Sequence, residues 1–286
     1  MLKCLAPAKI NLVLEVLGKR DDGYHEVRSL VQTISLCDVL SFELADVISL
    51  ECTEPSLQTS DNLVFQAAEL LKKVSGYREG VKIKLEKRIP WGAGLGGGSS
   101  DAATTLLALN KLWELKFTAS DLVELAARLG SDVPFFIYKG TALVEGRGEK
   151  VTPLAASMSG WFVLLMPPLP KVLNKTQQLY SRLDARHFTD GRLVSKAVKS
   201  WSQSRQIDAS LLFNVFDKVA FDAFSGLEGY WRCFEQAGAT DIHLVGSGPV
   251  LFAPIDGEAK AEEICHRLRH QGLEAYCVST VVPEAI

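Results

Sequence analysis

The segment PWGAGLGGGSSDAA at residues 90–103 decides the fold of this 286-residue chain. Its first half holds a dense run of glycines: Gly92, Gly94, Gly96, Gly97 and Gly98. Glycine loses more conformational freedom on ordering than any other residue, so this density is costly in an ordinary turn. It is favourable where backbone N–H groups must approach a ligand closely. The segment therefore predicts a loop built around a bound group.

A helix is predicted directly after the loop, from about Ser99 to Leu115. Its apolar residues recur at helical spacing: Ala102, Ala103, Leu106, Leu109 and Trp113. A helix N-terminus carries free N–H groups and the positive end of the helix dipole, so the loop and helix together favour an anion, above all phosphate. Ser99 and Ser100 add hydroxyls at the mouth, and Asp101 is expected to interact with the dipole from the first turn. The alternative, a flexible turn with a serine cap, leaves the glycines unexplained.

Two other phosphate-binding loops fit this segment less well. A Walker A loop needs a lysine after its last glycine, whereas Gly97 is followed by Gly98. The dinucleotide pattern GxGxxG is present, but the preceding strand VKIKLEK at 81–87 has a lysine-rich face, and a Rossmann strand is buried on both sides. The helix also leads into a second helix, where a parallel strand is required. A nicotinamide-dependent oxidoreductase is therefore disfavoured.

Composition and charge describe an ordinary globular chain. Apolar residues make up 47% and charged residues 23%, and 31 basic against 34 acidic residues give a net charge of −3. These values exclude a disordered or fibrous chain and disfavour a strongly basic nucleic-acid binder. No apolar run approaches the roughly 20 residues of a membrane helix, and Lys3, Lys9 and Glu15 interrupt any signal peptide. The six cysteines form no CxxC pair. We therefore expect a cytoplasmic protein with no nucleic-acid or membrane partner.

Strands and helices mix along the chain without an internal repeat. Leu12, Leu14 and Val16 alternate as in a half-buried strand. In the first half we also predict strands at 39–44 and 48–52, a helix at 61–73, and a helix capped by Thr118 or Ser120 that ends at Gly130. The second half predicts strands at 161–166, 241–245, 250–253 and 274–280, and helices at 175–183, 227–237 and 258–271. This mixture indicates an α+β chain with a boundary between two lobes near 155–160.

Four further motifs carry a family resemblance: PAKINL at 7–12, GKRDDGYHEVRSLVQT at 18–33, GSDVPFFIYKGTALVEGRGE at 130–149 and GSGPVLFA at 246–253. With the glycine loop, they resemble the GHMP kinases, which include galactokinase and the homoserine and mevalonate kinases. PAKINL and DGYH are similar to the branch of this family whose substrate carries a cytidine diphosphate. The resemblance implies a two-lobed fold, with a ribosomal protein S5 domain 2-like lobe over 1–155 and a ferredoxin-like lobe over 160–286. It also implies ATP-dependent phosphorylation of a substrate hydroxyl in the non-mevalonate isoprenoid pathway.

The same resemblance implies roles for individual residues. Lys9 is the catalytic-site lysine, and Asp132 is the general base for the substrate hydroxyl. The implied ATP-binding residues are Asn62, Lys87, Pro90, Trp91, Gly92, Ala93, Gly94, Leu95, Gly96, Gly97, Gly98, Ser99 and Ser100. The implied substrate-binding residues are Asn11, Tyr24, His25, Tyr180, Gly246, Ser247 and Gly248. Mg²⁺ is expected with ATP, although no protein ligand for it is identified, and the chain is expected to be a monomer or weak homodimer.

Each assignment has an ordinary structural alternative. Lys9 and Lys87 would otherwise be solvated strand lysines, Asp132 a turn or cap residue, and Tyr24–His25 an exposed hairpin tip. Asn62 would otherwise simply start a helix. A homoserine or mevalonate kinase, whose substrate carries no base, and a non-catalytic nucleotide-binding protein are the alternative functions.

Two segments depart from the family pattern. KVLNKT at 171–176 replaces the commoner Val-Ser-Thr. The assignment of Tyr180 as the second wall of the cytidine pocket is therefore undecided. Val245 replaces the usual serine or threonine before the glycine of the last motif, which removes one hydroxyl.

Overall fold

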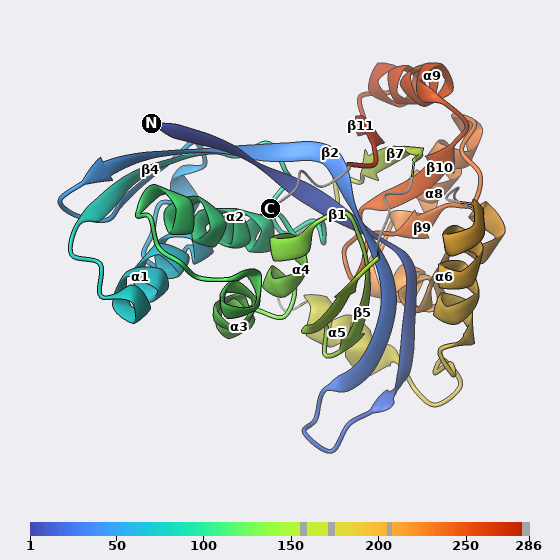
Figure 1. The fold of residues 1–286 in the computed structure, drawn as a ribbon. Helices are drawn as coiled ribbons and strands as arrows, with labels where there is room; N and C mark the ends of the chain where they lie inside the picture. Colours follow the sequence, from blue (N-terminus) through green and yellow to red (C-terminus); the bar gives the residue numbers. More distant parts are fainter. Residues whose placement is uncertain (155–158, 171–174, 205–207, 282–286) are drawn as a thin grey trace.

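The computed structural model describes residues 1–154, 159–170, 175–204 and 208–281. The structure has two β-sheets, each with helices packed against it, and the smaller sheet lies beside the middle of the larger one (Figure 1). The larger sheet has seven strands: β1 (Leu2–Lys19), β2 (His25–Ala45), β3 (Ser49–Cys52), β4 (Gly80–Glu86), β5 (Thr141–Gly146), β6 (Lys150–Pro153) and β8 (Phe213–Asn214). Five of them follow the order β3-β4-β2-β1-β8, and β5 pairs with both β2 and β6.

The long antiparallel pair of β1 and β2 runs from the left of Figure 1 to its centre, where it bends down into a projecting hairpin. We expected a half-buried strand at Leu12–Val16, and this expectation is wrong. Every residue of β1 from Ala6 to Val16 is buried, because helices of the first half cover one face and elements of the second half cover the other. The two short strands expected around 39–52 are the end of the long strand β2 and, after a turn, β3.

Four helices cover one face of the larger sheet: α1 (Leu63–Ser75), α2 (Gly97–Leu112), α3 (Ala119–Leu129) and α4 (Val133–Tyr138). Local side chains define where they begin. The Asn62 side chain accepts a hydrogen bond from the Val64 N–H at 2.9 Å and caps α1. Thr118, not Ser120, caps α3, in a capping box with Asp121. These helices and the sheet enclose an apolar core that includes Phe42, and α2 lies directly against β1.

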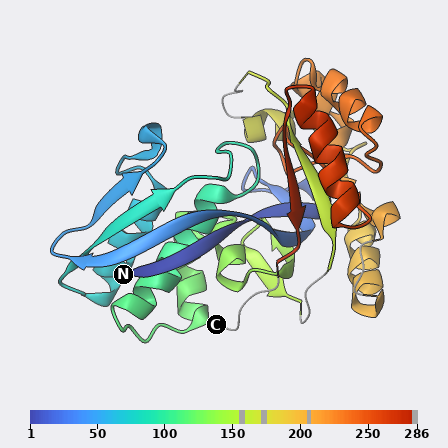
Figure 2. The same cartoon turned by 90° about the horizontal axis from the view of Figure 1, so that it is seen from above.

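The smaller sheet has four strands: β7 (Trp161–Met166), β9 (His243–Leu244), β10 (Leu251–Ile255) and β11 (Glu274–Ser279). Their order is β11-β7-β10-β9, and all three pairings are antiparallel. Numbered along the chain, this is the order 4-1-3-2 of a ferredoxin-like sheet. The helices of this half are α5 (Lys175–Arg182), α6 (Arg192–Ser204), α7 (Ala220–Ala223), α8 (Leu227–Gln236) and α9 (Glu258–His270). The expected α+β class is confirmed, with one sheet and its helices in each of two lobes (Figure 2).

Elements of the second half also join the first sheet. β8 pairs in parallel with β1, and the N–H of Val194 in α6 donates a hydrogen bond of 2.8 Å to the buried Glu15 carboxylate of β1. Neither α6 nor β8 was predicted. The apolar residues of α6 recur at helical spacing, at Val194, Ala197 and Trp201, so this signal was present but overlooked, whereas β8 has only two residues. Residues 155–158 of the expected boundary lie outside the described residues, so the division at 155–160 stays a prediction. Within the described ranges, no helix is long and apolar enough to cross a bilayer.

Candidate active site

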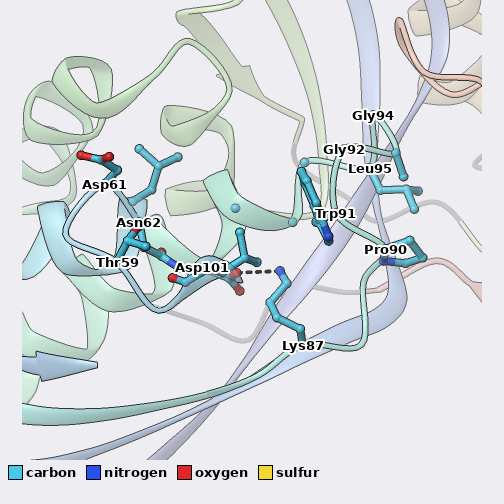
Figure 3. Close-up of a pocket in the computed structure, with 16 residues that line it drawn as sticks. Thr59, Asp61, Asn62, Lys87, Pro90, Trp91, Gly92, Gly94, Leu95 and Asp101 are labelled. Atoms are coloured by element: carbon cyan, nitrogen blue, oxygen red, sulfur yellow. Dashed lines mark hydrogen bonds and ion pairs between the residues drawn. The ribbon is translucent and has the colours of Figure 1, made fainter. Parts of the chain in front are cut away.

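The glycine-rich loop joins β4 to α2 and lines a pocket (Figure 3). Gly92, Gly94 and Gly96 have φ angles of 73°, 91° and 73°, a region that glycine adopts without strain. Gly96 is the N-cap of α2, so the free N–H groups of the helix open toward the loop. The pocket is lined by Leu57, Thr59, Asp61, Asn62, Leu63, Lys87, all residues from Pro90 to Gly98, and Asp101.

Most residues expected at the ATP site meet in this pocket. Asn62, at the start of α1, lies across the pocket from the loop, and Lys87, after the end of β4, lies at the base of the loop (Figure 3). Ser99 and Ser100 do not line it: both lie in the first turns of α2, and Ser100 is fully buried with no hydrogen-bond partner for its hydroxyl among the described residues.

Lys87 is not a solvated lysine. Its Nζ forms ion pairs with the buried carboxylates of Asp38 and, at 2.8 Å, Asp101 (Figure 3). Burial alone would lower the pKa of Lys87, but the two carboxylates outweigh this effect and raise it. The Asp38 carboxylate also accepts hydrogen bonds from the N–H groups of Arg88 and Ile89, at 2.6 and 2.8 Å. The three side chains therefore anchor the start of the glycine loop to β2 and α2.

Asp101 differs from the sequence expectation. Its carboxylate lies beyond the first turn of α2 and is paired with Lys87 rather than with the helix dipole. Burial raises the pKa of Asp101 to about 8 even though Lys87 acts in the opposite direction. Asp38 was missed altogether. The one signal for it was a lone carboxylate in the apolar run LCDVLSF at 36–42.

Lys9 and Asp132 approach each other beside the loop. Lys9 Nζ lies 3.9 Å from Asp132 Oδ2, and the Lys9 N–H donates to the Leu95 carbonyl at 2.9 Å. Burial lowers the pKa of Lys9, and the Asp132 charge partly offsets this. Asp132 occupies the N-cap position of α4, but its side chain makes no cap hydrogen bond. The carboxylate is therefore free of the role that a simple cap would give it.

A buried polar chain holds Lys9 in place. Lys9 Nζ donates to Asn11 Oδ1 at 2.8 Å, Asn11 Nδ2 donates to Ser29 Oγ at 2.9 Å, and the Ser29 hydroxyl donates to the Val13 carbonyl at 2.7 Å. Asn11 thus contacts Lys9, in addition to the substrate contact expected of it. Ser29 was not foreseen, because its partners lie on the neighbouring strand.

The last glycine motif, Gly246–Gly248, packs against Lys9 and the glycine-rich loop. A Cβ on Gly246 would lie 3.3 Å from Lys9 Nζ, and one on Gly248 would lie 2.0 Å from the Ala93 carbonyl oxygen. Only glycine at 248 lets the two loops meet so closely. Asn214 secures this loop by donating to the carbonyls of Leu244 and Gly246, each at 2.9 Å. Asn214 is a further residue that the sequence did not reveal.

The DGYH motif lies at the turn between β1 and β2. Tyr24 is 57% exposed, and the Arg147 guanidinium lies 4.9 Å from its ring centre. His25 stacks on Tyr180, with ring centres 4.7 Å apart and planes at 26°. Burial lowers the pKa of His25, which favours a neutral imidazole. Tyr180 therefore contacts His25 rather than standing alone as a second wall, and Arg147, within the quoted GRGE segment, is an added neighbour of Tyr24.

Tyr180 and Arg147 connect the hairpin to Lys9 and Asp132. Burial, and secondarily the Asp132 charge, raise the pKa of Tyr180, so its ring lies within electrostatic range of that carboxylate. A Cβ on Gly148, the neighbour of Arg147, would lie 3.6 Å from Asp132 Oδ1. Lys9 and Asp132 thus stand between a phosphate-type loop on one side and an aromatic hairpin on the other.

Comparison with known proteins agrees with this arrangement. The model of the GHMP kinases N terminal domain matches residues 62–140, and that of the GHMP kinases C terminal domain matches residues 194–273. A 4-diphosphocytidyl-2-C-methyl-D-erythritol kinase of Dehalococcoides mccartyi is 47% identical over 99% of both chains. One of Shouchella clausii is 38% identical over 96% of this chain and 93% of its own.

Solved structures extend the comparison. A crystal structure of 4-(cytidine 5'-diphospho)-2C-methyl-D-erythritol kinase superposes with a TM-score of 0.84 at 33% identity, covering 99% of this chain and 100% of that one. A homoserine kinase from Cytophaga hutchinsonii shares the fold at a TM-score of 0.73 but only 17% identity, over 98% of this chain and 94% of its own. The chain therefore belongs to the GHMP kinase family and, within it, to the 4-diphosphocytidyl-2-C-methyl-D-erythritol kinases.

Proposed function

We propose that this kinase transfers the γ-phosphoryl group of ATP to the 2-hydroxyl of 4-diphosphocytidyl-2-C-methyl-D-erythritol. The observation that carries the proposal is the position of Lys9 and Asp132, 3.9 Å apart, between the glycine loop and the DGYH hairpin. The names of the relatives at up to 47% identity over 99% of the chain support the same substrate.

The catalytic pair divides the chemistry between a base and a cation. The partly exposed Asp132 carboxylate accepts the proton of the attacking hydroxyl, a role that contributes about 10²–10⁴-fold in general base catalysis. The buried Lys9 ammonium orients that hydroxyl and stabilises negative charge on the transferred phosphoryl oxygens. Because the transition state of phosphoryl transfer is mostly loose, positioning and charge matter more than early proton removal.

The hairpin recognises the cytidine end of the substrate. Tyr24 presents an exposed aromatic face, and stacking of a base on such a face contributes about 1–3 kcal/mol. A neutral His25 held against Tyr180 offers one donor and one acceptor to the edge of the base. The Arg147 guanidinium above Tyr24 adds a cation near the diphosphate of the substrate.

A coupled assay of ADP release tests the proposal. The protein is supplied with ATP and, in parallel, with the cytidylyl substrate, mevalonate or homoserine. We expect turnover with the cytidylyl substrate and none above background with the other two. Preference for mevalonate or homoserine would replace the substrate assignment. Tight ATP binding without turnover on any acceptor would favour a non-catalytic nucleotide-binding protein.

We propose that Mg²⁺ binds together with ATP. The only basis for this is the negative charge of the ATP phosphates, which a divalent cation neutralises. Among the described residues, no group of three or more His, Cys, Asp or Glu side chains could hold a metal ion. The Asp101 carboxylate in the pocket is already paired with Lys87. Mg²⁺ in kinases is commonly held by few protein ligands together with phosphate oxygens, where it neutralises their charge. No residue of this chain is assigned as its ligand.

A cytoplasmic location and a monomeric or weakly dimeric state complete the proposal. All six cysteines carry free thiols, which agrees with a reducing compartment. Size-exclusion chromatography with light scattering would measure the oligomeric state directly.

A further inference from the structure

A second lysine reaches the glycine loop from the opposite lobe. Lys175 is the first residue of α5, and its Nζ donates a hydrogen bond to the carbonyl oxygen of Gly92. Gly92 lines the nucleotide pocket. The next residue, Thr176, lies with its hydroxyl 2.7 Å from the Ser247 hydroxyl of the last glycine motif. The start of α5 is therefore held at the junction of both glycine loops.

The charge of Lys175 is poorly compensated. Its hydrogen-bond acceptor is an uncharged carbonyl, and within the described residues no carboxylate forms an ion pair with it. The charged group that acts on it is Lys9, and burial together with this like charge lowers the pKa of Lys175 to about 8. Two ammonium groups thus lie within electrostatic range of each other beside a loop shaped for an anion. A polyphosphate between them would remove this repulsion.

The geometry of the ammonium group allows a second partner. A lysine Nζ carries three N–H donors, and Gly92 uses one of them. Two donors are left for phosphate oxygens without breaking the contact with the loop. Lysine binds phosphate as a compact point charge, and a hydrogen bond to a charged group is stronger than one between neutral partners.

We propose that Lys175 is a further phosphate-binding residue of this kinase, which contacts the terminal phosphates of ATP opposite Lys9. The proposal rests on the proposed function for the identity of the donor, ATP. It does not depend on the acceptor. Lys175 belongs to the KVLNKT segment, which departs from the commoner Val-Ser-Thr pattern. Its position across the cleft also makes the second lobe a direct participant in binding of the nucleotide.

Calorimetry with the full chain separates this role from a structural one. The probes are adenylyl imidodiphosphate, which carries the three phosphate groups, and adenosine, which carries none. Lys175→Met is expected to weaken binding of the triphosphate analogue about 10-fold or more, the usual scale for a lost charged hydrogen bond. Adenosine binding is expected to stay unchanged. Lys175→Arg, which keeps the charge, is expected to restore most of the affinity. Arg182→Met removes an exposed charge from the same helix and is expected to change neither affinity.

Kinetics locate the phosphate that Lys175 contacts. In the ADP-release assay, we expect Lys175→Met to lower kcat about 10-fold or more while KM for the cytidylyl substrate changes less than two-fold. A rise confined to KM for the cytidylyl substrate, with analogue binding unchanged, would assign Lys175 to the acceptor's diphosphate and overturn the proposal. Equal loss of analogue and adenosine binding would also overturn it, because Lys175 would then only shape the loop. The calorimetric result stands even if the acceptor is a different alcohol.

Discussion

Lys9 Nζ lies 3.9 Å from Asp132 Oδ2, and the two side chains differ in exposure, at 8% for Lys9 and 52% for Asp132. The cation is therefore held in a dry, fixed position, while the carboxylate is open to solvent and, in the proposed mechanism, to the incoming hydroxyl. Charge acts more strongly on a reacting group in a low-dielectric site, so the buried partner is the better stabiliser of phosphoryl charge. If Asp132 is the proposed base, its exposure lets it pass the proton to solvent after each turnover.

Replacing Asp132 by Asn should lower turnover without weakening substrate binding. Asn keeps the shape and one acceptor oxygen but removes the charge and the basicity. We expect kcat to fall at least about 10²-fold, the lower end for general acid–base catalysis. Single-turnover phosphoryl transfer with both substrates saturating measures this step directly. Because Asp132 makes no cap hydrogen bond in α4, the thermal midpoint should change little. A folded variant that transfers phosphate within a few-fold of wild type would remove Asp132 from the mechanism.

The effects of the Lys9 and Asp132 substitutions on the free energy of activation should not be additive. Lys9→Ala is expected to lower kcat as well, because it removes a cation from the same transition state. Groups that act on one transition state cost less together than the sum of their separate effects. The double variant should therefore lose less than the product of the two single losses. Full additivity of the two free energies of activation would mean that the residues act in different steps.

The parts of the site that follow from local sequence were predicted well. The glycine density around Gly96 and the apolar stripe behind it define the loop and α2, because both are short-range patterns. The start of α1 was similarly visible in Asn62. These features depend on capping and periodicity within a few residues.

The supporting residues were not predictable in the same way. Asp38 in β2 contacts the start of the loop that follows β4, 50 residues later at Arg88, and Asn214 secures a motif 32 residues later at Gly246. The burial of β1 on both faces depends on how the second half packs. Such contacts are set by tertiary structure, which overrides local pattern, so a single sequence carries no direct signal for them.

Tyr24→Ala should weaken binding of the cytidylyl substrate by about 1–3 kcal/mol through lost stacking. The side chain is 57% exposed, so its removal should cost little stability. Calorimetric titration with the cytidylyl substrate and, separately, with adenylyl imidodiphosphate measures both ends of the site. Tyr24→Phe keeps the aromatic face and serves as the control, with near-normal affinity expected. Loss of analogue affinity with normal substrate affinity would mean that the two ends are reversed.

Asp38→Ala should destabilise the fold and loosen the nucleotide loop together. It removes one partner from the buried pair with Lys87 and the acceptor of the Arg88 and Ile89 N–H groups. Breaking a buried ion pair from one side costs about 3–5 kcal/mol when the other charge is left uncompensated. Because Asp101 still lies 2.8 Å from Lys87, we expect a loss below this range but above that of an exposed pair. Unfolding in urea measures this loss.

The control for Asp38 is Glu51→Ala, which removes the exposed partner of Lys82. An exposed ion pair contributes about 0–1 kcal/mol, so this variant should stay close to wild type. Equal effects of the two substitutions would show that the Lys87 cluster adds no more than a surface pair.

Asp101 should make stability depend on pH in the opposite sense to an ordinary ion-paired aspartate. Burial raises its pKa to about 8 in the folded chain, and its Oδ1 has no hydrogen-bond partner among the described residues. In the unfolded chain the pKa of an aspartate is about 3.9. Between these values the folded state binds the extra proton, so the contribution of Asp101 to stability falls as pH rises toward 8 and is level above it. The Lys87 and Asp38 side chains face the carboxyl and do not reverse this sign.

Asp101→Asn tests this directly, because an amide does not titrate. We expect the free energy of unfolding of the variant, relative to wild type, to rise steadily from pH 6 to pH 8 and to level off near pH 9. Urea unfolding at these pH values provides the comparison. Asp121→Asn in the capping box of α3 is the matched control: hydrogen bonds from Thr118 lower the pKa of Asp121, so its difference from wild type should not change across this range. If the Asp101→Asn difference is equally flat from pH 6 to pH 9, the Asp101 carboxyl is ionised throughout, and Lys87 rather than burial controls its charge.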